Sequence, residues 1–316
     1  MTGEVAELSY ALGWRLVRML PGPIAARLFR AGGDLAARRG GPGVRQLRAN
    51  LARVLGHGDR VPRSLDTAEL DAVVVAAMRS YARYWCEAFR LPAMAPSLVH
   101  ELVSPGVHGI EYLGRALSRG RGVIAALTHS GNWDVAGVWL VRELSRLGEP
   151  ATLVTVAERL HPESVYERFL AYRRGLGFEV LPADRGAWTV ATLAARLRAN
   201  RVVCLLADRD VTGAGIEVDF FGAPARLPAG PAALARRTGA TLVPFAGWFT
   251  PDGWGLRFHP PIEPPSGEPT SVVVHAVTQA LADVFTRDIA SHPADWHMLQ
   301  PIWISDWGLA SPRAQP

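Results

Sequence analysis

The sequence contains no lysine, and all 34 of its basic residues are arginine. This absence excludes Schiff-base chemistry, a P-loop lysine and a kinase-type lysine. The two cysteines, Cys86 and Cys204, are too few for a disulfide framework or a zinc cluster, and they fit a reducing compartment. The longest segments free of Asp, Glu and Arg, 238–251 and 269–282, have fourteen residues each. A membrane-spanning helix needs about twenty apolar residues, so we expect no transmembrane helix.

Several common catalytic patterns are also missing. The chain has no G-x-S-x-G elbow, no H-E-x-x-H zinc motif and neither of the usual glycine-rich loops for dinucleotides or phosphates. Its nine histidines are scattered, so we expect no metal site and no resident cofactor. The pI of 9.7 raises the question of nucleic-acid binding, but no nucleic-acid-binding motif accompanies it. We therefore expect no nucleic-acid partner.

The residues that are present suffice for a large core. Hydrophobic residues make up 49% and charged residues 20% of the 316 positions, which excludes global disorder. Positive charge is concentrated at the start, where residues 1–60 hold ten arginines and four acids, a local net charge of +6 against +5 for the whole chain. Trp, Leu and Phe lie between these arginines, which favours contact with an anionic membrane surface. The alternative is an ordinary helical bundle with a solvated basic face.

The predicted secondary structure changes near residue 105, from helices alone to alternating strands and helices. Before it, helical periodicity predicts helices at 4–20, 24–39, 43–55 and 66–90. After it, the expected strands are 122–128, 151–156, 178–182, 202–207, 241–249 and 255–258. The expected helices are 134–147, 162–176, 187–199, 231–238 and 271–291. This alternation predicts one integrated α/β domain at 105–309, with a mixed, mostly parallel sheet flanked by helices, after a helical N-terminal region at 1–104 and before a tail at 310–316.

The segment from Thr128 to Asp134 is the strongest candidate for a catalytic site. His129 follows an expected strand, and a helix is expected to begin near Asp134. In α/β sheets the chemistry gathers at the carboxyl ends of strands. A turn of this length, made tight by Gly131, lets the Asp134 carboxylate fold back onto the imidazole and fix its tautomer. Nε2 then faces the substrate as a general base. A structural histidine and a helix-capping aspartate are the alternative.

Three further charged residues belong to the same end of the sheet. Glu158 and Asp208 each come at the end of an expected strand, so both carboxylates are expected to reach the cleft beside His129. Arg173 shares a helix face with apolar residues, unlike Arg174, and such an arginine usually has an anionic partner. The alternatives are helix caps or surface carboxylates for the two acids, and a structural ion pair of either one with Arg173.

His129 and Asp134 form an H-x4-D pattern, and the loop between them resembles that of the glycerolipid acyltransferases. Within that family the chain is similar to the bacterial lipid A lauroyl/myristoyl acyltransferases, and above all to the actinobacterial phosphatidylinositol mannoside acyltransferases. Further segments share the resemblance: 79–92, Glu158-Arg159-Leu160 with Phe169 and Arg173, Asp208-Arg209-Asp210 with Phe220-Phe221-Gly222, and 228–244. The similarity covers about residues 10–305.

The resemblance implies a peripheral enzyme on the cytoplasmic face of the cell membrane. It would move a fatty acyl chain from acyl-CoA, a co-substrate, to the 6-hydroxyl of a mannose on phosphatidylinositol mannoside. It implies His129 as the general base, with Asp134 orienting it and no acyl-enzyme. The residues implied to bind the substrate or to support His129 are Glu158, Arg173, Asp208, Arg209 and Asp210.

Aromatic residues are the candidates for contact with the acyl chain or the membrane. Phe220 and Phe221 follow a glycine-containing loop and are expected to line an acyl groove or to insert into a membrane face, with core packing as the alternative. Trp296, Trp303 and Trp307 suit a membrane interface and suit packing equally, because an indole tolerates one wet end.

Two other functions stay open at this point. A lipid A-type (Kdo-lipid) acyltransferase would use acyl carrier protein as donor and would usually carry an evident N-terminal membrane anchor. A non-catalytic lipid-binding protein would keep His129 and Asp134 without using them.

Overall fold

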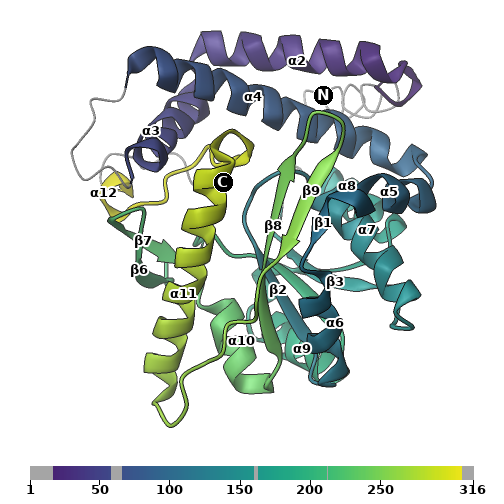
Figure 1. The fold of residues 1–316 in the computed structure, drawn as a ribbon, viewed down its shortest axis with the longest axis vertical. Helices are drawn as coiled ribbons and strands as arrows, with labels where there is room; N and C mark the ends of the chain where they lie inside the picture. The colour runs from purple at the N-terminus through teal and green to yellow at the C-terminus, as the bar shows by residue number, and fades with distance from the viewer. Residues whose placement is uncertain (1–16, 58–65, 160–162, 212, 308–316) are drawn as a thin grey trace.

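A seven-stranded sheet forms the centre of the protein (Figure 1). The computed structural model describes residues 17–57, 66–159, 163–211 and 213–307. The strand order is β1-β9-β8-β2-β5-β3-β4. The strands are β1 (Val107–His108), β2 (Val123–Leu127), β3 (Leu153–Ala157), β4 (Phe178–Pro182), β5 (Val202–Leu206), β8 (Thr241–Phe249) and β9 (Trp254–Phe258). Neighbouring strands are parallel except for β8 and β9, so the predicted mixed, mostly parallel sheet is confirmed.

The pairing register fixes what lies at the carboxyl edge of the sheet. β2 runs between β5 and β8, and Leu127 at its end pairs with Leu206 of β5. β3 is the other neighbour of β5. Residues that follow β2, β5 and β3 therefore leave the sheet side by side, although they are far apart in the sequence.

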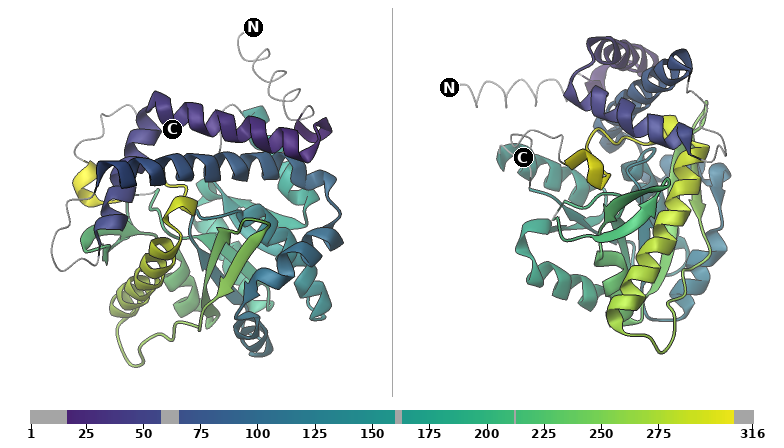
Figure 2. Two further views of the ribbon diagram at one scale, coloured as in Figure 1. Left: turned by 45° about the horizontal axis from the view of Figure 1, so that its top comes forward. Right: turned by 90° about the vertical axis from the view of Figure 1, so that its left-hand side faces the viewer.

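Helices cover both faces of the sheet (Figure 2). One face packs against α5 (Pro96–Val103), α6 (Ile110–Ser118), α7 (Trp133–Arg146) and α8 (Glu163–Gly175). The other packs against α9 (Ala187–Arg198), α10 (Gly230–Thr238) and α11 (Thr270–Ser291). Along β2, Ala125 points into the first core while Ile124 and Ala126 point into the second. Because both faces are buried, the strand is an uninterrupted apolar run, which makes it recognisable in the sequence.

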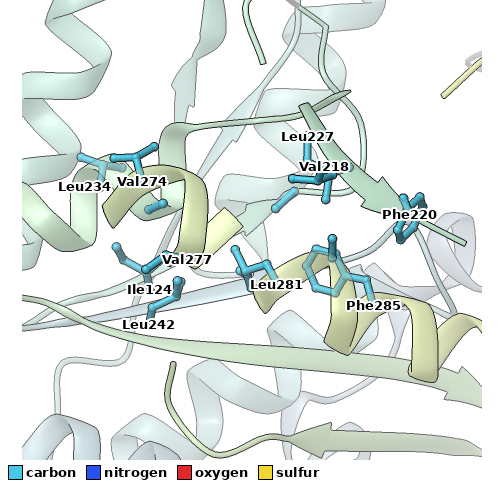
Figure 3. Close-up of a cluster of buried hydrophobic side chains, with 14 of the residues drawn as sticks. Ile124, Val218, Phe220, Leu227, Leu234, Leu242, Val274, Val277, Leu281 and Phe285 are labelled. Carbon is cyan, nitrogen blue, oxygen red and sulfur yellow. The ribbon is translucent and has the colours of Figure 1, made fainter. Parts of the chain in front are cut away.

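A two-stranded hairpin, β6 (Ile216–Phe220) and β7 (Ala223–Leu227), stands apart from the main sheet. The sequence patterns predict neither strand, because Glu217 and Asp219 interrupt the apolar run in β6. Figure 3 shows the hairpin packed on α11, with Phe220 beside Phe285 of that helix.

Three helices lie over the carboxyl edge of the sheet: α2 (Gly22–Arg39), α3 (Pro42–Gly56) and α4 (Thr67–Arg90). They confirm the helices predicted at 24–39, 43–55 and 66–90, whereas most of the helix predicted at 4–20 lies outside the described residues. α2 runs beside α4 as the outer layer (Figures 1 and 2). Asp66 caps α4 by accepting a hydrogen bond from the Ala68 backbone N–H at 3.0 Å. A last short helix, α12 (Ile304–Trp307), ends the described chain.

Within the described ranges, no helix combines the length and the apolar character that crossing a bilayer requires.

Candidate active site

His129 and Asp208 lie beside each other where β2 and β5 end. Ala207 still donates its backbone N–H to the Leu127 carbonyl at 2.8 Å, so the parallel register brings the next residues of both strands together. His129 Nδ1 is 2.6 Å from Asp208 Oδ1, and the His129 backbone N–H donates to Asp208 Oδ2 at 2.9 Å. With Nδ1 engaged by a carboxylate, Nε2 is the ring nitrogen available to a substrate.

The Asp208 carboxylate is completely buried and still charged. Burial alone would raise the pKa of this carboxyl, but the charge and hydrogen bonds of His129 bring it below its ordinary value. The Trp296 indole N–H, which donates to Asp208 Oδ2 at 2.9 Å, lowers the pKa further. An ionised carboxylate at this position holds the Nδ1–H tautomer of His129 and stabilises the imidazolium that forms when Nε2 takes a proton.

Asp134 does not make the contact that the sequence predicted. Its Oδ1 accepts a hydrogen bond from Arg173 Nε at 3.0 Å, and its Oδ2 accepts one from the Tyr84 hydroxyl at 3.0 Å. The carboxylate bonded to the His129 ring is Asp208 instead. The expected pairing of Asp134 with the imidazole is therefore corrected.

The reason lies in how α7 begins. Asn132, rather than Asp134, caps the helix, because its side chain accepts a hydrogen bond from the Val135 backbone N–H at 3.1 Å. Gly131 permits this turn with a φ of 61°, and a Cβ there would lie 2.8 Å from a backbone carbon of Gly247. Asp134 is then the second residue of the helix, and its carboxylate meets α4 and α8 rather than the loop that holds the histidine.

Arg173 has the anionic partner that its position predicted. Its side chain is buried, whereas Arg174 is exposed. The partner is Asp134, in place of the Glu158 or Asp208 considered from the sequence. Burial alone would lower the pKa of Arg173, but the neighbouring Asp134 carboxylate raises it above its ordinary value. The guanidinium is therefore a permanent cation that neutralises Asp134.

This ion pair supports the aromatic surface beside the histidine. Burial, together with the charge of Asp134, raises the pKa of Tyr84 well above its ordinary value, so the phenol stays neutral. The Tyr84 ring stacks on Trp133 with centroids 4.1 Å apart. Trp133 in turn meets the His129 ring edge to face at 5.8 Å. The Asp134–Arg173 pair thus contacts the aromatic side chains beside His129, and both residues also line the cavity next to it.

Three further predicted residues, Glu158, Arg209 and Asp210, lie near the same edge of the sheet and line a cavity there. Arg209 Nη2 and Glu158 Oε1 form an ion pair at 2.6 Å that joins the loops after β5 and β3. Asp210 is buried, and its Oδ2 accepts a hydrogen bond from the Gly215 backbone N–H at 2.6 Å. The predicted position of Glu158 and Asp208 at neighbouring strand ends is confirmed.

A cavity of about 820 Å³ opens above His129. Aromatic side chains of α4, α7 and α8 form one wall, among them Tyr84, Trp133 and Phe169. Aliphatic side chains of α9, β5 and α10 form another, among them Leu193, Leu205 and Leu234. Apolar walls around a few convergent polar groups are typical of sites for lipid-like ligands, and this volume suits a large one.

The aromatic residues expected at a groove or interface are mostly in the core. Phe220 and Phe221 are 0% and 6% exposed, and neither is among the residues that line the 820 Å³ cavity. The expected acyl groove or membrane insertion at this pair is therefore corrected to its alternative, core packing. Trp296 and Trp303 are fully buried in the same cluster, whereas Trp307 is exposed.

Tyr84, Trp296 and His297 contact the site, although no sequence pattern assigns them to it. His297 donates its backbone N–H to the His129 carbonyl at 2.8 Å, and its ring lines the cavity. No local motif could have placed these residues, since Trp296 lies 88 positions from Asp208. Among the described residues, no group of His, Cys, Asp and Glu side chains comes together to hold a metal ion.

Comparisons with known proteins agree over nearly the whole chain. The sequence profile of the bacterial lipid A biosynthesis acyltransferases matches residues 2–305. A phosphatidylinositol mannoside acyltransferase of Mycolicibacterium smegmatis is 52% identical over 305 residues, which cover 96% of this chain and 93% of that protein. A protein of the same description from Mycobacterium tuberculosis is 48% identical over 316 residues, covering 100% of this chain and 93% of that protein.

Proposed function

The chain belongs to the bacterial lipid A biosynthesis acyltransferase family and is an acyltransferase, and we propose that its acceptor is a phosphatidylinositol mannoside. The proposal rests on one observation above all: His129, paired with the buried Asp208, lines an apolar cavity in a chain about half identical to enzymes described as acting on that lipid. The acyl donor we propose is acyl-CoA, and the acceptor group is the 6-hydroxyl of a mannose.

The proposed reaction is a direct transfer between two bound substrates. His129 Nε2 takes the proton of the mannose hydroxyl as its oxygen attacks the thioester carbonyl. The carbonyl becomes a tetrahedral oxyanion, which collapses to the ester as the carbon–sulfur bond breaks. The departing thiolate then takes the proton from the imidazolium and leaves as CoA thiol. Asp208 holds the opposite side of the ring throughout and stabilises the imidazolium.

In this proposal, different walls of the cavity bind different parts of the substrate. The aliphatic side formed by Leu193, Leu205 and Leu234 suits an acyl chain. The Glu158–Arg209 ion pair and Asp210 offer donors and acceptors to the sugar hydroxyls, and an arginine suits the phosphodiester of the lipid. Asp134 and Arg173 shape the aromatic wall by holding Tyr84 and Trp133 in place.

The outer face of α2 supports contact with an anionic membrane surface. Ile24, Leu28 and Leu35 are exposed on this helix, 46%, 58% and 46% respectively. Exposed arginines Arg27 and Arg30 lie among them. A basic helix that presents apolar side chains to solvent suits the interface of an anionic bilayer. We propose that the enzyme binds the cytoplasmic face of the cell membrane through this helix.

The test is an assay of the purified enzyme with radiolabelled palmitoyl-CoA and a lipid extract that contains phosphatidylinositol mannosides. A parallel reaction supplies palmitoyl-acyl carrier protein, which separates the two donors. The expected product is a labelled mannoside formed from palmitoyl-CoA.

Each other result changes a defined part of the proposal. Label on a different lipid would overturn the acceptor and leave the enzyme class. Transfer from the carrier protein alone would overturn the donor. No transfer from either donor to any lipid would favour a lipid-binding protein without activity.

A further inference from the structure

Trp296 lies where it can control the carboxylate that faces His129. Asp208 Oδ1 is taken by His129 Nδ1, and Asp208 Oδ2 accepts from the His129 backbone N–H and from Trp296 Nε1, each at 2.9 Å. Two of these three donors belong to the histidine itself. The Trp296 indole is the donor that comes from another part of the chain. It therefore fixes the rotation of the Asp208 carboxylate independently of the His129 imidazole.

We propose that Trp296 is a positioning residue of the acyl transfer reaction, acting through the Asp208 carboxylate on the His129 imidazole. The inference rests on the proposed function, and the tryptophan itself touches no substrate in it. Its effect is to hold the carboxylate in the plane and at the distance that keep Nδ1–H in place while Nε2 accepts a proton.

The segment that bears Trp296 also holds the loop that bears the histidine. Trp296 forms an antiparallel bridge with Ser130. On either side of it, the Gly131 backbone N–H donates to the Asp295 carbonyl at 3.0 Å and the His297 backbone N–H donates to the His129 carbonyl at 2.8 Å. One short stretch after α11 therefore fixes both the backbone around His129 and the orientation of the Asp208 carboxylate.

The aromatic side chains packed around the Trp296 indole restrict its rotation. Trp296 is fully buried, with ring centroids 6.2 Å from Phe220 and 6.5 Å from Phe221. The aromatic pair of the β6–β7 turn thus has a role beneath the site, because it leaves the indole little freedom to rotate away from Asp208.

The donor is neutral, and this matters for the chemistry. An arginine at the same place would neutralise Asp208, as Arg173 neutralises Asp134. An indole N–H stabilises the carboxylate and leaves its charge available to the imidazolium. Other ionisable groups along the same segment and cavity are His297, whose pKa burial lowers to about 3, Asp295, whose pKa burial raises, and the Arg209–Glu158 ion pair with Asp210.

The experiment compares Trp296→Phe with Trp303→Phe. Both indoles are fully buried in one cluster and both donate a hydrogen bond at 2.8 to 2.9 Å, but Trp303 donates to the Phe220 backbone carbonyl. We expect Trp296→Phe to lower kcat by about tenfold or more with KM for both substrates unchanged. As the pH is lowered, the activity of this variant should begin to fall at a higher pH than that of wild type. The reason is that the Asp208 carboxyl takes up a proton more readily without the indole N–H. Trp303→Phe should change none of these values by more than about twofold.

A spectroscopic measurement on the protein alone separates this inference from the proposed function. The proton between His129 Nδ1 and Asp208 gives a downfield ¹H resonance, which should move in Trp296→Phe and stay in place in Trp303→Phe. If either variant fails to fold, benzothienylalanine introduced at position 296 or 303 alone keeps both fused rings and removes only the N–H. Equal kcat values and an unmoved resonance in the two variants would overturn the positioning role. A wild-type enzyme without transferase activity would overturn the proposed function, and the resonance would then decide the role of the indole.

Discussion

Asp208 and Asp134 are two buried aspartates near one histidine, and they differ in what their carboxylates face. Their exposed fractions are 0% and 1%. Asp208 meets an imidazole, a backbone N–H and an indole, none of which carries a permanent charge. Asp134 meets the guanidinium of Arg173 and the phenol of Tyr84. A carboxylate already neutralised by a guanidinium stabilises a protonated imidazole less, so we propose that the two aspartates have different roles despite equal burial.

The largest expected effect comes from removing the His129 imidazole, which either carboxylate was a candidate to orient. His129→Ala should lower acyl transfer by about 10⁴-fold, because general base catalysis contributes up to about 10⁴ and the Asp208 carboxylate acts only through this ring. The matched control is His275→Ala, which removes an exposed histidine of α11. Initial rates with saturating substrates measure both. A His129→Ala rate within twofold of wild type would contradict the role of His129 as the general base.

The second prediction concerns stability at Asp134. Asp134→Leu leaves the Arg173 guanidinium buried and unpaired, so unfolding in urea should show a loss of about 3–5 kcal/mol. The double variant Asp134→Leu/Arg173→Met removes both charges and should recover part of that loss. The half-exposed pair Glu179 and Arg196 is the control, and its removal should cost less than about 1 kcal/mol. Additive losses for Asp134 and Arg173 would show that the two side chains do not depend on each other.

The third prediction concerns His297, which lines the cavity together with His129. Burial lowers the pKa of His297 to about 3 from an ordinary value of 6.5. Below pH 6.5 the unfolded chain therefore binds a proton that the native protein refuses, and stability falls as the pH falls. Between pH 7.5 and 5.5 this histidine should account for a loss of about 1.4 kcal/mol. Urea unfolding at both pH values should show a smaller difference in His297→Gln than in wild type, and identical differences would contradict the assignment.

The smallest effect per substituted residue is expected for the arginines, to which the same distinction applies. Arg173 is neutralised in the core, whereas Arg27 and Arg30 of α2 are exposed and available to an anionic surface. Arg27→Gln/Arg30→Gln should weaken binding to anionic vesicles by about 1 kcal/mol for each charge and leave binding to neutral vesicles unchanged. The control Arg115→Gln/Arg198→Gln removes two exposed arginines from α6 and α9. Equal losses in both variants would mean that only net charge matters.

Local patterns predict most of the sheet and much of the site. β2 and β5 are apolar runs bounded by polar residues, so the sequence alone places their ends correctly, and with them His129 and Asp208. It does not identify the partner of the histidine, because spacing along the chain favours Asp134 while the parallel register favours Asp208. The role of Trp296 is beyond local patterns for the same reason, since its contact with Asp208 depends on how α11 returns the chain to the carboxyl edge.

The choice of carboxylate is tested most directly by the single-turnover rate of acyl transfer in Asp208→Asn and Asp134→Asn, each divided by the fraction of protein that is folded. Both substitutions keep the shape of the side chain and remove its charge. Asp208→Asn should slow the transfer step by about 10³-fold or more, because the amide no longer holds the Nδ1–H tautomer or stabilises the imidazolium. Asp134→Asn should slow it by less than about tenfold, through the aromatic wall alone. A larger loss in Asp134→Asn than in Asp208→Asn would contradict the assignment of Asp208 as the partner of His129.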